Sequence, residues 1–292
     1  MDFASLRPLL DQAIKLRLTG FNASHQTLSG SGHEEAFRLF NGFYEGFPDL
    51  VLDVYGHTLV IHDYSEAPDP SFIQKAVELV CNSLNWLRAG ILKTRNSSTQ
   101  KEKRGVLIFG EQPDRKIKEH GIWYAIDLTM NRDASFYLDT GNLRKWLIEN
   151  AGGKSVLNTF AYTGSLGVAA FAGRASKVVQ TDLNRQFLNL AKDSYILNDF
   201  PIEKQNFIAQ DFFPAIARFK AGRQTFDCVI IDPPFFSTTP RGKVDLEHQS
   251  ERLINKARSS TTAAASSPLT TQSFSADQTI CEHSKNFAKT GI

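Results

Sequence analysis

The stretch that decides the fold reads Val156-Leu157-Asn158-Thr159-Phe160-Ala161-Tyr162-Thr163-Gly164-Ser165-Leu166-Gly167. Its first residues are apolar enough for a buried strand, and its last residues begin a segment with helical spacing. The glycine in the turn between them lets a ligand approach the backbone at the N-terminus of a helix. This strand, turn and helix predict a site for a nucleoside-like ligand.

The alternation of strand and helix continues beyond this unit. We predict strands at 155–158, 177–181, 206–209 and 227–232, and helices at 166–172, 187–197 and 213–219. Such alternation is typical of parallel strands joined by right-handed crossovers. The fold class that we predict is therefore α/β, with a doubly wound, Rossmann-like sheet.

A small α+β domain is predicted ahead of this sheet. Asn41-Gly42 and Phe47-Pro48-Asp49 mark turns, and Gly56-His57 joins two strands into a hairpin. A helix is expected after Pro70, and a short amphipathic helix is expected to end near Gly20. The predicted strands of this domain lie at 50–55, 58–64, 91–94, 106–109 and 122–128.

Four parts of the chain follow from these patterns. They are an N-terminal helix and linker (1–35), a small α+β domain considered for RNA binding (36–130), the doubly wound core (131–258) and a low-complexity tail (259–292). The tail is rich in Ser, Thr and Ala without apolar periodicity, so we expect it to be disordered or out of frame.

The core itself is predicted to be incomplete. From Lys243 a helix is expected to run to about Arg258, and no fifth strand is recognisable after it. Three strands that such a sheet should contain are then missing, and the strand at 229–231 would have an unpaired edge. The sequence therefore predicts a truncated or frame-shifted product.

The composition indicates a globular protein without a dominant charge. The 292 residues carry 33 Lys and Arg against 31 Asp and Glu, so any RNA-binding surface must be local. No signal peptide and no apolar run of membrane-spanning length is present. The three cysteines lack the spacing of disulfide frameworks or zinc sites. We expect a soluble cytoplasmic protein without a metal, and its oligomeric state is left open.

Acidic residues follow the second and third strands of the predicted sheet. Asp182 lies where an acid can accept hydrogen bonds from both hydroxyls of a ribose. Asp211 lies where an acid can accept a hydrogen bond from an adenine amino group, while an aromatic neighbour such as Phe212 packs on the ring. An Asp after a strand is more often a helix N-cap, but these two in register with the glycine turn predict a nucleoside site.

The glycine pattern of the turn separates two classes of ligand. A dinucleotide enzyme would have G-x-G-x-x-G for the pyrophosphate, whereas this turn has only Gly164 and Gly167. The pattern favours a ligand without phosphates, so an oxidoreductase is the weaker alternative.

The fourth strand leads into Asp232-Pro233-Pro234-Phe235. The two prolines fix the backbone and remove two N–H donors, so the segment presents acceptors. Its carboxylate and carbonyl oxygens can hold an exocyclic amine, and Phe235 can stack on a flat base. Alone, this motif is as often a plain rigid turn; after three matched strand ends it predicts the segment that faces the substrate.

Together these motifs resemble the class I S-adenosylmethionine-dependent methyltransferases, and within them the large-subunit ribosomal RNA methyltransferases that modify cytosine C5 or guanine N7. The resemblance covers about residues 37–257. Its marks are R-L-F-N-G-F-Y-E-G-F-P-D at 38–49, F-Y-L-D-T with Asn142 and Arg144, and N-T-F-A-Y-T-G at 158–164.

The resemblance implies S-adenosylmethionine as cofactor and a base of RNA, in particular ribosomal RNA, as substrate. The cofactor-binding residues that we predict are Asn158, Phe160, Tyr162, Thr163, Gly164, Asp182, Leu183, Asp211 and Phe212. The predicted catalytic residues are Asp232, Pro233, Pro234 and Phe235.

The acceptor atom and the RNA contacts stay open at this point. Enzymes that methylate cytosine C5 need a cysteine thiolate, yet D-P-P-F has none and Cys228 lies on a buried strand. Guanine N7 or an exocyclic amine are the other acceptors, and an inactive cofactor- or RNA-binding remnant is an alternative of another class. The candidates for phosphate contact are Lys93, Arg95, Lys101, Lys103, Arg104, Arg115, Lys116 and Lys118.

Overall fold

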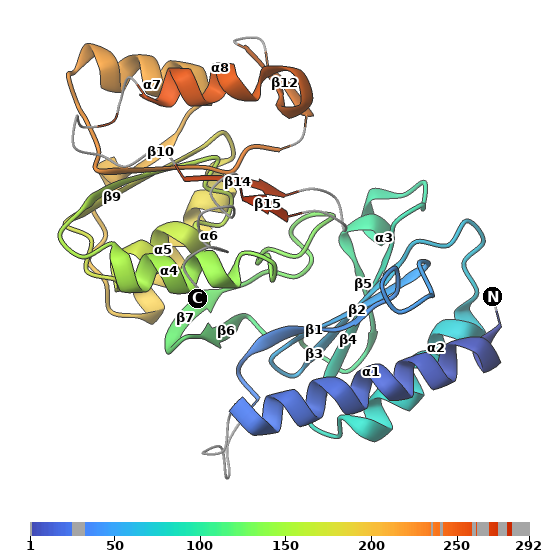
Figure 1. Cartoon of the computed structure of the whole chain (residues 1–292). Helices are drawn as coiled ribbons and strands as arrows, with labels where there is room; N and C mark the ends of the chain where they lie inside the picture. The colour runs from blue at the N-terminus through green and yellow to red at the C-terminus, as the bar shows by residue number, and fades with distance from the viewer. Residues whose placement is uncertain are drawn as a thin grey trace. The chain divides into compact units, whose positions relative to one another are not determined.

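The computed structural model describes residues 2–24, 33–234, 236–239, 242–258, 261, 269–273 and 279–281. The chain divides into two compact units, Met1–Leu138 and Asp139–Ile292, and each has its own sheet (Figure 1). Within the described ranges, no helix is long and apolar enough to cross a membrane. The same ranges contain no cluster of His, Cys, Asp and Glu that could hold a metal ion.

The first unit is built on a five-stranded sheet with the order β1-β2-β3-β4-β5. Its strands are β1 Ala36–Asn41, β2 Leu50–Tyr55, β3 Thr58–Asp63, β4 Ala89–Thr94 and β5 Val106–Phe109. β3 and β4 are parallel, and the other neighbours are antiparallel. The predicted hairpin at Gly56-His57 is confirmed, since it joins β2 to β3.

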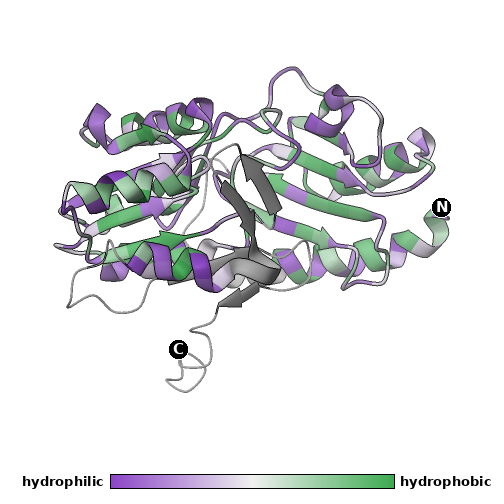
Figure 2. Cartoon of the chain, turned by 90° about the horizontal axis from the view of Figure 1, so that it is seen from above, coloured by the Kyte–Doolittle hydropathy of each residue, from purple (hydrophilic) through white to green (hydrophobic). Residues whose placement is uncertain are grey.

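Helices α1 (Phe3–Ser24) and α2 (Pro70–Ser83) lie side by side along this sheet (Figure 1). Leu6 and Leu10 of α1 are fully buried in the core that both helices form with the strands. Figure 2 shows the same pattern, with apolar residues on the strands and polar residues on the outer faces of the helices. α1 continues past Gly20, because one glycine costs a helix only about 1 kcal/mol.

Helix α3 (Gln100–Arg104) and a hairpin of β6 (Lys116–Glu119) and β7 (Ile122–Ala125) complete the first unit. The sequence did not indicate β6, because its alternate positions carry charged residues. Ile117 is the fully buried member of this strand, and a single apolar residue is too weak a period-two signal to identify a strand.

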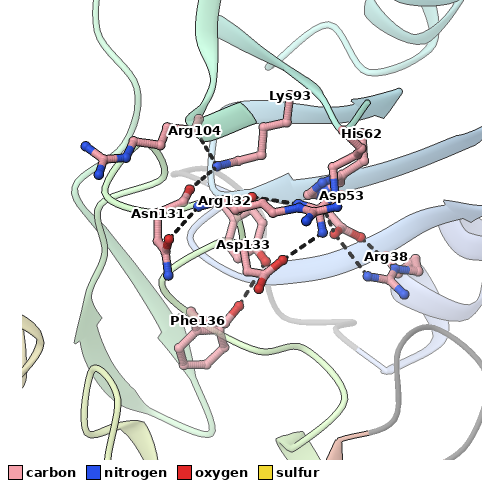
Figure 3. Close-up of polar contacts among 11 residues, drawn as sticks. Arg38, Asp53, His62, Lys93, Arg104, Asn131, Arg132, Asp133 and Phe136 are labelled. Atoms are coloured by element: carbon pink, nitrogen blue, oxygen red, sulfur yellow. Dashed lines mark hydrogen bonds and ion pairs between the residues drawn. The ribbon is translucent and has the colours of Figure 1, made fainter. Parts of the chain in front are cut away.

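A ladder of charged side chains crosses four strands of this sheet (Figure 3). Nε and Nη2 of Arg38 donate hydrogen bonds to the two carboxylate oxygens of Asp53, at 2.8 and 3.2 Å. Asp53 also lies 3.4 Å from Nε2 of His62, which is paired in register with Lys93 on β4. Burial lowers the pKa of His62, so at neutral pH the carboxylate of Asp53 is balanced mainly by the arginine.

The far end of the ladder holds the segment 131–136 on the sheet (Figure 3). Nζ of Lys93 donates to the carbonyl of Asn131 at 3.0 Å, and Nη2 of Arg95 lies 2.7 Å from the carboxylate of Asp133. Lys93 is fully buried and the side chain of Arg95 is 10% exposed. Lys93, a candidate for contact with RNA phosphates, therefore has no exposed surface for such a contact, and the candidate Arg95 is paired with Asp133 within the unit.

The second unit has a six-stranded sheet with the order β10-β9-β8-β11-β14-β15. Its strands are β8 Ser155–Thr159, β9 Lys177–Asp182, β10 Phe207–Ala209, β11 Cys228–Ile231, β14 Leu269–Ser273 and β15 Thr279–Cys281. The first five are parallel, and β15 is antiparallel to β14. The predicted doubly wound sheet is confirmed.

Helices cover both faces of this sheet (Figure 1). They are α4 Gly141–Asn150, α5 Ser165–Ala172, α6 Arg185–Leu197, α7 Phe212–Ala221 and α8 Leu246–Arg258, with a 3-10 turn at Lys204–Asn206. Val156 packs with α4 and α5, whereas the next residue, Leu157, packs with α7 and α8. Neighbouring residues of a strand point to opposite faces, so the two apolar residues of β8 contribute to the cores on both faces of the sheet.

Two expectations about the C-terminal part are wrong. The edge of β11 is paired, because Ile230 and Ile231 lie in register with β14, a strand within the segment that we expected to be disordered. Backbone pairing does not require an apolar period, and threonine favours strands. The helix α8 begins at Leu246 rather than at Lys243, which belongs to a hairpin of β12 (Phe236–Thr239) and β13 (Gly242–Asp245).

Lys93 should make stability depend on pH in the alkaline range. Burial, followed by the charge of Arg95, lowers the pKa of Lys93 to about 8 from 10.5. The unfolded chain then binds more protons between these values, so stability rises with pH across this window. The free energy of unfolding of the wild type should rise relative to that of Lys93→Met by on the order of 3 kcal/mol between pH 8 and 10.5.

Urea denaturation at a series of pH values measures this difference. Lys75→Met is the matched control, because Lys75 is exposed on α2 and its curve should run parallel to that of the wild type. A curve for Lys93→Met that also runs parallel would contradict the assignment.

Candidate functional site

The carboxyl ends of β8, β9 and β11 meet at one edge of the second sheet. β8 lies between β9 and β11. The chain forms β9 and β10 on one side of β8 and then returns to form β11 on the other side. In open sheets of this kind, ligands bind beyond the carboxyl ends of the strands at such a switch point. The turns that follow these strands therefore form the candidate site.

The turn after β8 has an unusual backbone. Phe160, Tyr162 and Gly164 all have positive φ, at 51°, 51° and 77°. Residues other than glycine rarely adopt this left-handed conformation, and they keep it only where surrounding contacts impose it. The turn is thus a constrained element of the kind that occurs at ligand sites.

Two ring contacts hold the side chains of this turn. The ring of Phe160 stacks on that of Phe212, with centroids 4.8 Å apart, and Tyr162 meets Phe187 edge-on at 4.6 Å. Phe212 begins α7 and is 5% exposed in the core. The turn after β8 is therefore anchored to α6 through Phe187 and to α7 through Phe212.

Asp182 ties the turn after β8 to the turn after β9. The backbone N–H of Tyr162 donates to Oδ2 of Asp182, and the N–H of Asn184 donates to Oδ1, both at 2.8 Å. Burial raises the pKa of Asp182, and these backbone donors act in the opposite direction. The N-cap of α6 is Asn184, so Asp182 is not the helix cap that this residue type commonly provides after a strand.

The other predicted cofactor-binding residues differ in their exposure to solvent. Leu183 is 64% exposed beside Asp182, whereas Thr163 is 4% exposed. Asp211 is the N-cap of α7 and accepts the N–H of Phe213 at 3.0 Å, so it also performs the ordinary structural role of its type. Asn158 is 1% exposed and lies beneath the turn.

This donor and acceptor set fits a nucleoside. A Cβ atom on Gly164 would lie 2.5 Å from Cβ of Ala191, so only glycine fits at the point where the turn packs on α6. The carboxylate of Asp182 has further lone pairs for ribose hydroxyls. The exposed side chain of Leu183 offers apolar surface next to them.

The acidic segment after β11 begins beside the turn after β8. Ile231 is paired in register with Thr159, so Asp232 and Phe160 leave the sheet from neighbouring strands. Asp232 is partly buried, Pro233 is buried and Pro234 is exposed. Phe235, the fourth predicted catalytic residue, lies outside the described residues.

A family model of S-adenosylmethionine-dependent methyltransferases matches residues 93–261, which is more than half of the chain. The chain belongs to this family. S-adenosylmethionine is accordingly the cofactor of this methyltransferase, and the oxidoreductase alternative is wrong.

Similar proteins include several ribosomal RNA methyltransferases. Ribosomal RNA large subunit methyltransferase I of Photobacterium profundum is 28% identical over 82% of this chain and 63% of the relative. Ribosomal RNA large subunit methyltransferase I of Aeromonas salmonicida is 30% identical over 69% of this chain and 52% of the relative. Ribosomal RNA large subunit methyltransferase K/L of Colwellia psychrerythraea is 31% identical over 76% of this chain and 32% of the relative. This chain therefore matches less than two thirds of each relative's length.

Solved structures share the fold of this methyltransferase. A crystal structure of a methyltransferase complexed with SAH superposes with a TM-score of 0.76, at 22% identity over 90% of this chain and 67% of the other. A SAM-dependent methyltransferase from Agrobacterium tumefaciens gives a TM-score of 0.61, at 20% identity over 85% and 75%.

Sequence reasoning missed two residues of the candidate site. Phe187 packs on Tyr162, but nothing in the sequence pairs these rings. Gln180 is fully buried and accepts a hydrogen bond from Asn158 at 3.4 Å. A glutamine that directly follows two valines of a strand is a signal that could have identified it.

Cys228 lies away from the site. It is the first residue of β11, whereas the site follows the last residue. Burial raises the pKa of Cys228 to about 11. A thiol with this pKa is almost entirely protonated at neutral pH, which agrees with the structural role expected for it.

Asp182→Ala should abolish tight binding of S-adenosylmethionine. The change removes the acceptor of two backbone N–H groups and the predicted ribose ligand, and hydrogen bonds to charged groups contribute about 1.5–3 kcal/mol each. We expect affinity to fall by about 100-fold, or roughly 2.7 kcal/mol, in calorimetric titration of the folded chain. Asp193→Ala, which removes an exposed carboxylate of α6, is the control. Equal affinities for both variants would contradict the assignment of Asp182.

Proposed function

We propose that this methyltransferase transfers a methyl group from S-adenosylmethionine to a base of RNA, in particular of large-subunit ribosomal RNA in the cytoplasm. The observation that carries the proposal is the register of β8 and β11, in which Thr159 is paired with Ile231. Because of this register, the glycine turn and the acidic proline segment begin on adjacent strands. The activity named for the relatives supports ribosomal RNA as the substrate.

The bound cofactor supplies an electrophilic methyl group on a sulfonium. The side chain of Asp232 and the carbonyl of Pro233 would accept hydrogen bonds from an exocyclic amine of the base, and the carboxylate of Asp232 would take the proton that the nitrogen loses when it is methylated. The prolines keep competing N–H donors out of this segment. Orientation of the base and exclusion of water then account for most of the rate enhancement.

A nitrogen acceptor fits these residues better than cytosine C5. Methylation of C5 requires a thiolate near the base, and Cys228 is partly buried at the opposite end of β11. Among the residues whose side chains the structure describes, no thiol lies at the carboxyl end of the sheet. A nitrogen with a lone pair attacks directly and needs no covalent catalyst. Guanine N7 has no proton to lose, so the proton-accepting role of Asp232 favours an exocyclic amine as the acceptor.

The first unit offers a surface for the RNA backbone on its β6–β7 hairpin. Nζ of Lys116 and of Lys118 lie 4.2 and 5.1 Å from the ring centroid of Trp123. The other face of the hairpin buries Ile117 and Tyr124 in the core. Two ammonium groups beside an indole ring combine phosphate neutralisation with a stacking surface, as in proteins that bind single-stranded nucleic acid.

Asp232→Asn tests the proposed activity. We expect methyl transfer to a large-subunit ribosomal RNA transcript to fall by about 100-fold, within the range that positioned proton acceptors contribute, while affinity for S-adenosylmethionine stays within about threefold. Transfer of labelled methyl groups measures the first quantity, and calorimetric titration measures the second. A wild-type chain that binds the cofactor but methylates no RNA would contradict the proposal.

The cysteine variants separate the two acceptor classes in the same assay. Cys228→Ser should keep the wild-type rate, because its thiol is remote from the site. Mass spectrometry of the product nucleosides should show an N-methylated base. A 5-methylated cytosine together with loss of activity in Cys281→Ser would refute the nitrogen acceptor.

Replacing Lys116 and Lys118 together by glutamine should weaken RNA binding and its dependence on salt. Each phosphate contact contributes about 0.7–0.9 to the slope of log K against log salt concentration, so the slope should fall by about 1.5. Fluorescence anisotropy with a ribosomal RNA fragment over a series of KCl concentrations measures it. Lys75→Gln, on the exposed side of α2, should leave the slope unchanged, and an equal change in both variants would argue against this hairpin.

A further inference from the structure

Gln180 is a polar residue in the middle of a buried strand. Its side chain is fully buried, and in the parallel register of β8 and β9 it lies opposite Asn158. Nδ2 of Asn158 donates to Oε1 of Gln180 at 3.4 Å. Burying an amide is unfavourable unless its hydrogen bonds are replaced, so this position calls for a specific explanation.

The Gln180 side chain fills the space next to both glycines of the cofactor turn. A Cβ atom on Gly164 would lie 2.6 Å from Oε1 of Gln180, and one on Gly167 would lie 2.4 Å from Cδ and Oε1. Real Cβ atoms essentially never approach other atoms this closely. The backbone at the start of α5 therefore rests directly on this amide.

The hydrogen bonding of the amide is incomplete. Nε2 of Gln180 and the hydroxyl of Tyr195 are both buried, and neither makes a hydrogen bond of regular geometry in the described part of the chain, although the two side chains interact with each other. Burial raises the pKa of Tyr195, and the nearby Gln180 acts in the opposite direction. An apolar side chain of the same size would avoid this desolvation, so folding stability alone does not explain a glutamine here.

Gln180 and Asp182 act on the same turn from one strand. They are two residues apart on β9, so their side chains leave the same face of the sheet. Asp182 holds the turn through the N–H of Tyr162, while Gln180 contacts its last residue, Gly164. Asp182 holds the turn by a hydrogen bond, and Gln180 limits how closely the turn can approach β9.

We propose that Gln180 is a positioning residue for the cofactor turn. Its buried amide, held by Asn158, supports Gly164 and Gly167 and sets the position of the turn relative to Asp182. Loss of this support allows the turn to move toward β9, and a side chain at position 167 displaces the turn in the opposite direction. Both changes misplace the backbone that faces S-adenosylmethionine.

A double-mutant cycle with Gly167→Ala and Gln180→Ala tests the proposal. Each single variant should bind S-adenosylmethionine about tenfold more weakly than the wild type, which corresponds to about 1.4 kcal/mol. The double variant should recover to within about threefold of the wild type, because the new methyl group at position 167 occupies space that the glutamine vacated. Calorimetric titration without RNA measures these affinities, so the result does not depend on the proposed RNA substrate.

Thermal unfolding of the variants without cofactor is the second measurement, because it separates a loss of folding stability from a loss of affinity for S-adenosylmethionine. Gln180→Met keeps the space filled but loses the hydrogen bond from Asn158, so it should bind the cofactor about threefold to tenfold more weakly than the wild type and should not rescue Gly167→Ala. Gly152→Ala is the glycine control, because a Cβ there would meet nothing closer than a carbonyl oxygen at 3.6 Å. Its affinity should not change.

Two results would overturn the proposal. One is additive loss of affinity in the double variant, which would mean that Gly167 and Gln180 act independently. The other is a Gln180→Ala variant with lower thermal stability but wild-type affinity, which would make the amide a purely structural group. If Gln180→Ala does not fold, Gln180→Ser takes its place in the cycle with the same expectations.

Discussion

The carboxylate of Asp182 accepts hydrogen bonds from the backbone N–H groups of two turns, at Tyr162 and at Asn184, and the arrangement of the candidate cofactor site depends on it. Both donors belong to the main chain, so the constraint acts on the path of the backbone rather than on one side chain. It helps to keep Phe160 and Tyr162 in a left-handed conformation that neither residue favours. The exposed Leu183 is positioned by the same turn.

The parallel sheet sets the relative position of the turn after β8 and the segment after β11. Pairing of Ile231 with Thr159 brings the acidic proline segment next to the glycine turn, and apolar residues on both faces of the strands fix the sheet between its helices. Gln180 is one of the buried polar residues of this core, and it lies next to the glycines of the turn. Stability of the sheet and geometry of the site are thus set by the same strands.

The first unit uses buried charge in a different way. Arg38 and Asp53 form a bidentate pair, and Lys93 donates to a backbone carbonyl of the segment 131–136. Charges inside a protein are tolerated when they are paired or hydrogen-bonded, and here they hold a segment without regular secondary structure on the sheet. Basic residues that remain at the surface, such as Lys116, are the ones available to an anionic partner.

The sequence by itself determined the order of strands and helices in the core, the glycine turn and the acids at the strand ends, because these follow from local periodicity and from residue types at strand termini. Only the tertiary structure decided that Lys93 is buried, that Gln180 lies under Gly164, and that β14 covers the edge of β11. Each of these depends on segments that are distant in the sequence. Burial and strand pairing arise from such neighbours, and a local pattern contains no information about them.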